Sequence, residues 1–337
     1  MSTLTHIPDV VLNRILEDCD FRAIICLRKV CRDLRCHIDR AVPDVKLSHL
    51  DVYAFEGFVV VEYGESGKVK YEENEKGYSV QSKSEEEPKI LENLNYLNVF
   101  FEDLKFMMKH QKSILNKCAF LRRVPDKKFD MSPFFSRLMD TLKSKSTPLK
   151  TENLVVEVCN EDEVMATLPY FDAEILNDLW IIHPLNKRPV GAMPIRRIVE
   201  LKQWKKARLG GIPGSYVAND CLKHFLHLHS SLLHVDTVRL DDLEFLKNNF
   251  LLAESFEECD FNYKTLDFKE EELSNLYGAP LIEETHSKRF LWFFKRPRSE
   301  KVLKVEHESS ENPRFSFINT EKEHVPVGAT VRDVEES

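Results

Sequence analysis

The first part of the chain shows a helical pattern of apolar positions. Val11, Leu12, Ile15 and Leu16 recur at the spacing of one helix face, and Pro8 stands where a helix can begin without losing a backbone donor. A second apolar stripe follows at Ile24, Leu27, Val30, Leu34 and Ile38. The pattern predicts two or three short helices. Because a unit of about 45 residues without disulfide or metal is near the lower limit for independent folding, another surface has to cover its apolar face.

Between Phe58 and Gln81 the apolar pattern changes to a period of two. Runs of β-branched and aromatic residues at 58–63, 68–71 and 77–80 are separated by glycine-containing turns, which predicts a small antiparallel meander. Residues 64–68, Gly-Glu-Ser-Gly-Lys, faintly resemble a phosphate-binding loop. They lack its first glycine and its final hydroxyl residue and lead into a strand, so they predict a hairpin turn.

Helical spacing returns beyond an acidic connector at Ser82–Pro88. Apolar stripes from Leu97 to Met108 and from Phe134 to Leu142 predict two further helices. Stripes of this kind pack into a core far more often than they line a cofactor pocket. We therefore expect both helices to cover other parts of the fold.

In the C-terminal half, strand-like and helix-like segments alternate. The strand candidates, whose centres fall roughly every 24 to 29 residues, are 154–158, 179–182, 209–212, 232–235 and 256–261. The helix candidates between them are 164–168, 195–207, 217–225 and 240–250. Strand–helix units of this length favour parallel strands in a curved, irregular repeat. The predicted fold class is α+β, with a small all-α N-terminal region followed by an irregular α/β, leucine-rich-repeat-like solenoid.

The residue types in the N-terminal helices resemble an F-box. The arrangement Ile-Pro-Asp-Val-Val-Leu from Ile7, together with the leucine and isoleucine positions up to Arg35, is similar to the divergent F-box form abundant in nematodes. In that family the helices dock on the Skp adaptor of a cullin–RING ubiquitin ligase. The resemblance implies these adaptor-facing residues: Ile7, Pro8, Leu12, Ile15, Leu16, Leu27, Val30, Cys31 and Leu34. Many F-boxes carry leucine where Cys19 stands and tryptophan where Leu34 stands, so this chain offers less apolar surface there.

A second resemblance covers roughly residues 130–265, which look like the FTH domain of nematode F-box proteins. Its most specific part is the core Gln203, Trp204, Lys205 and Ala207, followed by the pair His224 and Phe225. Other fitting pieces lie at 136–149, 167–171 and 238–247. Together, the two resemblances suggest an F-box A type protein. The implied organisation is F-box at 1–45, β-meander and helical connector at 46–130, FTH domain at 131–265, and late strands with a mobile tail at 266–337.

Composition and charge narrow the classes of partner. The 337 residues are 42% hydrophobic and 31% charged, and 48 lysines and arginines stand against 56 acidic residues, a net charge of −8. This is the balance of a globular protein without a basic field for nucleic acid or an anionic membrane. Neither a membrane-spanning run nor a signal peptide is visible, so we expect the cytoplasm or the nucleus. Eight cysteines without a Cys-x-x-Cys spacing predict reduced, buried thiols.

Three further patterns in the sequence are of the kind that can carry chemistry. His224, His227 and His229 do not share one helix face, so ordinary packing is expected rather than a metal site. The basic and aromatic run at 288–298 combines the ingredients of a single-stranded nucleic-acid surface, but a late strand with charged flanks explains it better. Nucleotide-binding glycine motifs are missing. We therefore expect no catalytic residue, metal or cofactor in this chain.

Three functions remain open at this point. The first is a substrate-receptor subunit of a Skp–cullin–F-box ubiquitin ligase, binding Skp through its N-terminal helices and a target protein through the α/β half. The second is a protein-interaction scaffold that works without the ligase and uses the F-box for internal packing. The third, least favoured, is RNA-associated regulation through residues 288–304.

Overall fold

The computed structural model describes residues 7–75, 77–82, 89–92, 95–123, 130–184, 191–284, 287–297 and 299–333. Most of the acidic connector predicted at 82–88, Arg298 and the last four residues lie outside the described residues. The chain divides into two compact units. The first comprises Met1–Val158 and Asp162–Leu176, and the second comprises Cys159–Glu161 and Asn177–Ser337.

Three short helices open the described chain, as the apolar stripes predict. They are α1 (Asp9–Asp18), α2 (Phe21–Val30) and α3 (Arg32–Ala41). The Asp20 side chain caps α2 by accepting a hydrogen bond from the Ala23 backbone N–H at 2.7 Å. Cys31 has an extended backbone that ends α2, and its Sγ accepts from the Leu34 N–H at 3.5 Å to start α3. These caps set the boundaries of the helical region.

The sheet of the first unit combines an antiparallel meander with parallel strands. Its strands are β1 (His49–Ala54), β2 (Phe58–Tyr63), β3 (Lys68–Asn74), β4 (Gly77–Ser82), β5 (Lys89–Glu92), β6 (Leu115–Arg122) and β7 (Thr151–Glu157). Neighbouring strands from β5 to β1 are antiparallel, whereas β1, β6 and β7 are parallel. The predicted meander is thus confirmed. A single 3₁₀ turn, η2 (Gly64–Ser66), joins β2 to β3, so the phosphate-loop-like residues form a hairpin turn.

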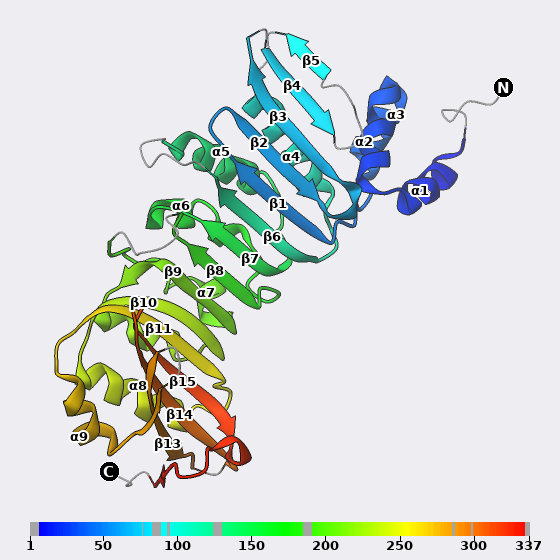
Figure 1. Cartoon of the computed structure of the whole chain (residues 1–337). Helices are drawn as coiled ribbons and strands as arrows, with labels where there is room; N and C mark the ends of the chain where they lie inside the picture. Colours follow the sequence, from blue (N-terminus) through cyan, green and yellow to red (C-terminus); the bar gives the residue numbers. More distant parts are fainter. Residues whose placement is uncertain are drawn as a thin grey trace. The chain divides into compact units, whose positions relative to one another are not determined.

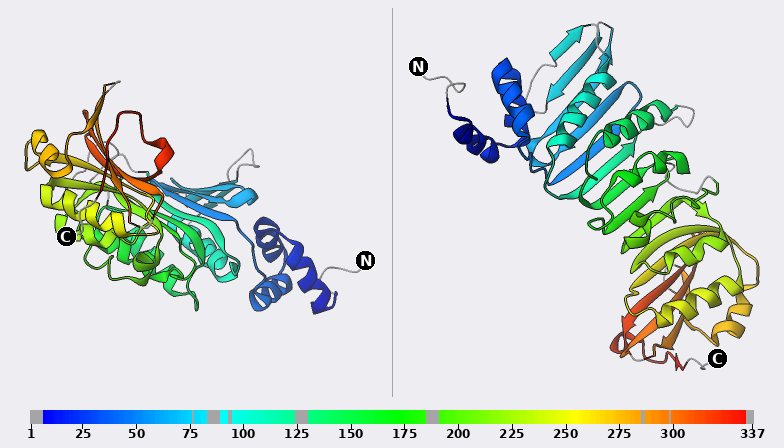
Figure 2. Two further views of the ribbon diagram at one scale, coloured as in Figure 1. Left: turned by 90° about the horizontal axis from the view of Figure 1, so that it is seen from below. Right: turned by 180° about the vertical axis from the view of Figure 1, so that it is seen from behind.

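Two predicted helices cover one face of this sheet. These are α4 (Tyr96–His110) and α5 (Ser132–Lys143), with the short α6 (Glu161–Met165) and η3 (Leu168–Tyr170) further along the chain. In the view from behind in Figure 2, α4 and α5 lie in front of the strands of the first unit. The rings of Phe100 on α4 and Phe134 on α5 stack with centroids 6.1 Å apart, and both are buried. The expectation that these stripes form core is correct.

The second unit places four parallel strands beside an antiparallel set. The parallel strands are β8 (Asp178–Ile182), β9 (Leu209–Val217), β10 (Ser230–Val238) and β11 (Glu258–Leu266). The sheet continues, in antiparallel order, through β15 (Arg314–Glu321), β14 (Lys301–Ser309), β13 (Lys288–Lys295) and β12 (Leu281–Glu284). A two-residue strand, β16 (Val331–Arg332), pairs in parallel with β13. Parallel pairing of the predicted strands 179–182, 209–212 and 232–235 is confirmed.

The helices of the second unit lie on one side of its sheet (Figures 1 and 2). They are α7 (Lys202–Lys206), η4 (Asn219–Phe225), α8 (Leu240–Leu252), η5 (Glu270–Glu272) and α9 (Leu273–Tyr277), while η6 (Lys322–His324) follows β15. The helix predicted over 195–207 is wrong in its first half, because Leu201 has an extended backbone and α7 starts only after it. Likewise, 219–225 forms 3₁₀ helix rather than the expected α-helix.

Two adjacent glycines allow β9 to lie tightly between its neighbours. A Cβ on Gly210 would come within 2.3 Å of the Leu179 carbonyl oxygen, and one on Gly211 within 2.0 Å of the Leu232 carbonyl oxygen. No real Cβ atom approaches an oxygen so closely. The sequence therefore needs glycine at both positions to keep β8, β9 and β10 in this register.

We predict that Gly211→Ala destabilises the second unit by roughly 1–3 kcal/mol or more, since the new methyl group must push two strand backbones apart. Urea unfolding followed by circular dichroism measures the change. Gly191→Ala is the matched control, because a Cβ there meets no atom within 4 Å. Equal unfolding midpoints for the two variants would contradict the close-packing argument.

Candidate functional site

The structure divides the nine predicted adaptor-facing residues by exposure. Leu12, Leu16 and Leu34 are buried inside the chain at 4%, 0% and 2% exposure. Val30 is 68% exposed, and Pro8 is exposed as well. The four remaining positions are partly exposed: Ile7, Ile15, Leu27 and Cys31. The helices thus use three of the predicted residues for their own packing and present the other six, at least in part, to solvent.

Two exposed apolar residues at the start of α1 were not among the predicted ones. Val10 is 80% exposed and Val11 is 47% exposed. The helical spacing contains a signal for Val10: it lies two residues before Leu12, which is about 200° around the helix from that buried position. An apolar side chain on the polar face of an amphipathic helix is the pattern that could have identified it.

An ion pair joins two of the N-terminal helices, and ring contacts join them to the rest of the first unit. The Arg28 guanidinium donates two hydrogen bonds to the Asp39 carboxylate, at 2.7 and 3.1 Å, and lies 4.7 Å from the ring centroid of Phe106 on α4. The hydrogen bond from Arg28 lowers the pKa of Asp39. On the other side of α2, the Phe21 ring lies 4.6 Å from that of Tyr63 on β2. One arginine thus connects α2, α3 and α4.

The segment between α3 and β1 is held by side chains that follow α4. The Gln111 amide accepts from the Leu47 N–H at 3.0 Å and donates to the Leu47 carbonyl oxygen at 3.1 Å. The Asp44 carboxylate accepts from the backbone N–H groups of Lys112 and Ser113 at 3.0 and 3.1 Å. Each of these hydrogen bonds joins a side chain to a backbone group, so together they fix the position of the connecting segment against the end of α4.

His110 adds a buried contact at the same place. Its Nδ1 donates to the Pro43 carbonyl oxygen at 3.2 Å, its ring lies 4.1 Å from that of Phe106, and its Nε2 makes no hydrogen bond to the described residues. Burial lowers the pKa of His110 to about 4. A proton added at Nε2 would therefore place an unpaired charge in this interior.

The FTH-like residues form a second cluster, in the other unit. The Trp204 indole N–H donates to the His224 carbonyl oxygen at 3.0 Å, and its ring meets that of Phe225 edge-on at 5.2 Å. Gln203 and Ala207 are buried beside them, whereas Lys205 is exposed and pairs with Glu200 at 2.7 Å. The structure thus brings together Trp204, His224 and Phe225 as a packing core.

The remaining chemistry candidates have structural contacts of their own. His227 bonds the Trp204 carbonyl oxygen at 2.9 Å and His229 lies 3.3 Å from the Arg208 guanidinium, so these histidines point to different partners. No group of metal-binding side chains occurs among the described residues. In β13 four consecutive apolar side chains, Leu291 to Phe294, are buried, which confirms the strand predicted there.

The cysteines follow the prediction only in part. All eight are free, and Cys118, Cys221 and Cys259 are buried. Cys26 and Cys36, however, are exposed, because they lie on the outer sides of α2 and α3 away from the buried stripe. None of the helices in the described part of the chain is long and apolar enough to cross a membrane.

Comparison with protein families decides the assignment of both clusters. The F-box domain model matches residues 4–46, and the FTH domain model matches residues 132–279. The chain contains an F-box domain and an FTH domain. No curated protein and no solved structure matched it. The exposed valines of α1 and α2 therefore belong to the F-box, and the Trp204 cluster belongs to the FTH domain.

We predict that Arg28→Gln lowers the free energy of unfolding of the first unit by about 1–2 kcal/mol, since it removes two charge-assisted hydrogen bonds and a cation–π contact at a half-exposed site. Thermal unfolding measures the loss. Arg32→Gln serves as the control because Arg32 is exposed and makes no ion pair with the described residues. A similar loss of stability in both variants would mean that Arg28 contributes only through the net charge of the protein and not through its contacts with Asp39 and Phe106.

Stability should also depend on pH through His110. A histidine whose pKa is lowered on folding binds its proton more readily when unfolded, so the free energy of unfolding falls as pH drops from about 6.5 towards 4, by up to about 3 kcal/mol. Chemical unfolding at pH 7 and pH 5 measures this fall. It should shrink in His110→Gln and stay unchanged in His324→Gln, an exposed control. An unchanged fall in His110→Gln would overturn the assignment.

Proposed function

We propose that this protein is a substrate-receptor subunit of a Skp–cullin–F-box ubiquitin ligase, acting in the cytoplasm or nucleus. Its F-box helices bind a Skp-type adaptor and through it a cullin, and its α/β region binds a target protein. The observation that carries the proposal is the F-box match combined with solvent-exposed apolar residues on α1 and α2: Val10, Val11 and Val30. Exposed apolar side chains on a folded domain are typical of partner surfaces.

The proposed role requires no catalytic residue in this chain. Holding a target lysine beside a ubiquitin carrier raises its effective concentration, which accelerates transfer without chemistry in the receptor. Arg28 of the F-box lies against Phe106 on α4, and the contacts of Asp44 and Gln111 attach the segment after the F-box helices to the residues that follow α4. As part of the same proposal, the successive strand–helix units form a leucine-rich-repeat-like solenoid that displays the target surface.

A second function, the ligase-independent scaffold, is favoured by one specific observation. Leu12, Leu16 and Leu34 are buried within this chain, so the helices already have an internal use for their apolar stripe. In this alternative the F-box completes the first unit and binds no adaptor. The two functions differ in a single measurable property, which is binding to Skp.

We predict that Val30→Asp weakens binding of the purified full-length protein to a recombinant Skp adaptor at least about tenfold, because a carboxylate cannot enter an apolar contact without losing its hydration. Leu252→Asp is the matched control. Val30 and Leu252 are each the last residue of a helix and are 68% and 72% exposed, so the substitutions perturb the fold alike.

Pull-down and calorimetry distinguish the outcomes. Binding by wild type and by Leu252→Asp, with loss in Val30→Asp, supports the receptor. Absence of wild-type binding by a protein with the circular dichroism spectrum of a folded α+β chain overturns it and favours the scaffold. Equal binding by all three proteins would remove Val30 from the interface and contradict this docking surface.

A further inference from the structure

The antiparallel strands at the end of the second unit have a face that its helices do not cover. The ring of Phe317 on β15 lies 5.5 Å from that of Phe250 on α8, which marks the helix side of the sheet. Val305 on β14 and Trp292 on β13 are the successive cross-strand partners of Phe317, so they point to the same side. The open face consists of the residues that alternate with them: Arg289, Leu291 and Phe293 on β13, and Val302, Lys304 and Glu306 on β14.

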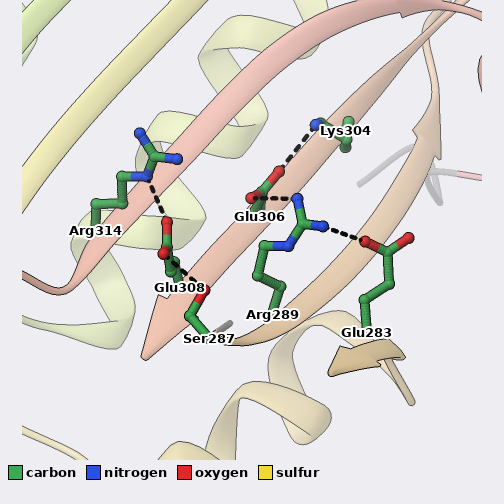
Figure 3. A network of polar contacts seen from close by, with 7 residues as sticks. All are labelled: Glu283, Ser287, Arg289, Lys304, Glu306, Glu308 and Arg314. Carbon is green, nitrogen blue, oxygen red and sulfur yellow. Dashed lines mark hydrogen bonds and ion pairs between the residues drawn. The ribbon is translucent and has the colours of Figure 1, made fainter. Parts of the chain in front are cut away.

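One half of the open face is polar and carries matched charges (Figure 3). Arg289 lies 2.8 Å from Glu283 of β12 and 3.6 Å from Glu306. Lys304 lies 2.9 Å from the same Glu306 carboxylate. These charges balance one another, so this half of the face needs no covering segment in water.

The other half of the open face is apolar. Leu291, Phe293 and Val302 form a buried cluster there. On the helix side of β13, Trp292 and Phe294 are buried as well, so the strand is apolar on both faces. A continuous apolar run of this kind is typical of a strand that is buried on both sides. The helices cover one side of β13, and the open face therefore needs a second cover over its apolar half.

The last described segment of the chain supplies this cover (red in Figure 1). We call residues 325–333 the C-terminal strap. Val325, Ala329 and Val331 of the strap pack, together with Leu281, against the apolar cluster. Ala329 and Val331 are two residues apart, so in an extended chain both side chains point the same way, towards the cluster. The open face thus already binds one extended apolar segment.

Backbone pairing and an arginine hold the end of the strap. Val331 and Arg332 form β16, which pairs in parallel with the edge of β13. The Arg332 guanidinium donates a hydrogen bond to the Ala279 carbonyl oxygen. The same side chain lies against Gly278, where a Cβ would come within 2.5 Å of the Arg332 Nε. This end of the sheet therefore accepts an extended sequence of the pattern apolar-x-apolar-Arg.

The strap is held by few contacts, so another segment can replace it. β16 has only two residues, and the three apolar side chains of the strap are only partly buried. Val327, in the middle of the strap, is fully exposed. The ion pair between Lys295 and Asp333, at 3.2 Å, joins side chains that are 68% and 84% exposed, and such a pair adds little stability. Short terminal segments with these properties are among the first parts of a fold to open.

We propose that the C-terminal strap is an autoinhibitory segment that occupies the binding site for an extended apolar-x-apolar-Arg segment of a target protein. The target segment pairs in parallel with β13, places its two apolar side chains on the cluster and its arginine against Gly278. In this mode of strand addition, main-chain hydrogen bonds give affinity and alternate side chains give specificity. The assignment rests on the proposed function, in which the α/β region binds the target.

A fluorescent peptide with the sequence of residues 325–333, added to the full-length protein, tests the site by anisotropy. We expect weak binding to wild type, because the strap occupies the site. Val331→Asp should bind the peptide at least about tenfold more tightly, since a carboxylate cannot stay on the apolar cluster and the apparent affinity rises with the fraction of open sites. Val327→Asp is the matched control: it places the same charge at a fully exposed position of the strap, and its affinity should match wild type.

Hydrogen exchange of the strap amides checks the release itself. Exchange should be faster in Val331→Asp and unchanged in Val327→Asp. A strap that exchanges no faster in Val331→Asp would show that its apolar contacts do not hold it, which contradicts the proposal. Equal peptide affinity in all three proteins would overturn it as well. So would a released strap without any gain in peptide binding.

A random peptide library displayed on phage and selected on the Val331→Asp protein tests the target pattern. We expect enrichment of apolar-x-apolar-Arg peptides, and selection of unrelated sequences or of none would refute the pattern. Skp binding by Val331→Asp should match wild type, because the strap belongs to the second unit and the F-box to the first. A protein that selects these peptides but binds no adaptor would retain the strap site and lose the ligase role.

Discussion

A β-sheet that helices cover on one side only must make its other side compatible with water by means of its own side chains. This constraint governs both units of the chain. In the first unit the uncovered positions form pairs such as Lys68–Glu62, Lys70–Glu72 and Lys117–Asp51, at 3.1, 2.8 and 3.1 Å. In the second unit the network around Arg289 does the same. Each pair adds little stability on its own, but together they keep a wide sheet surface polar without a net field.

How much of the structure can be predicted from the sequence depends on how far apart along the chain the contacting residues lie. Local signals sufficed for the three F-box helices, the meander and the parallel strands of the second unit. The β1 and β6 strands escaped prediction because Asp51 interrupts the apolar pattern of β1, and its partner Lys117 lies 66 residues further along the chain. The break of the helix at Leu201 is likewise set by tertiary packing rather than by any proline or glycine at that position. The sequence alone could not show which apolar residues of the F-box are exposed. Leu16 and Val30 both lie on apolar stripes with helical spacing, but Leu16 is buried and Val30 is exposed.

The distribution of exposed apolar side chains favours an external partner over internal packing alone as the use of the F-box. Among the described residues eight large apolar side chains are exposed, and three of them, Val10, Val11 and Val30, fall within the three N-terminal helices. The other five are spread over the remaining chain, as is usual for isolated surface residues. A segment that served only to complete the first unit would turn its apolar residues inward, as Leu16 and Leu34 do. Retaining valines in water on the same short helices costs solubility without adding stability, which is the pattern of a surface kept for another protein.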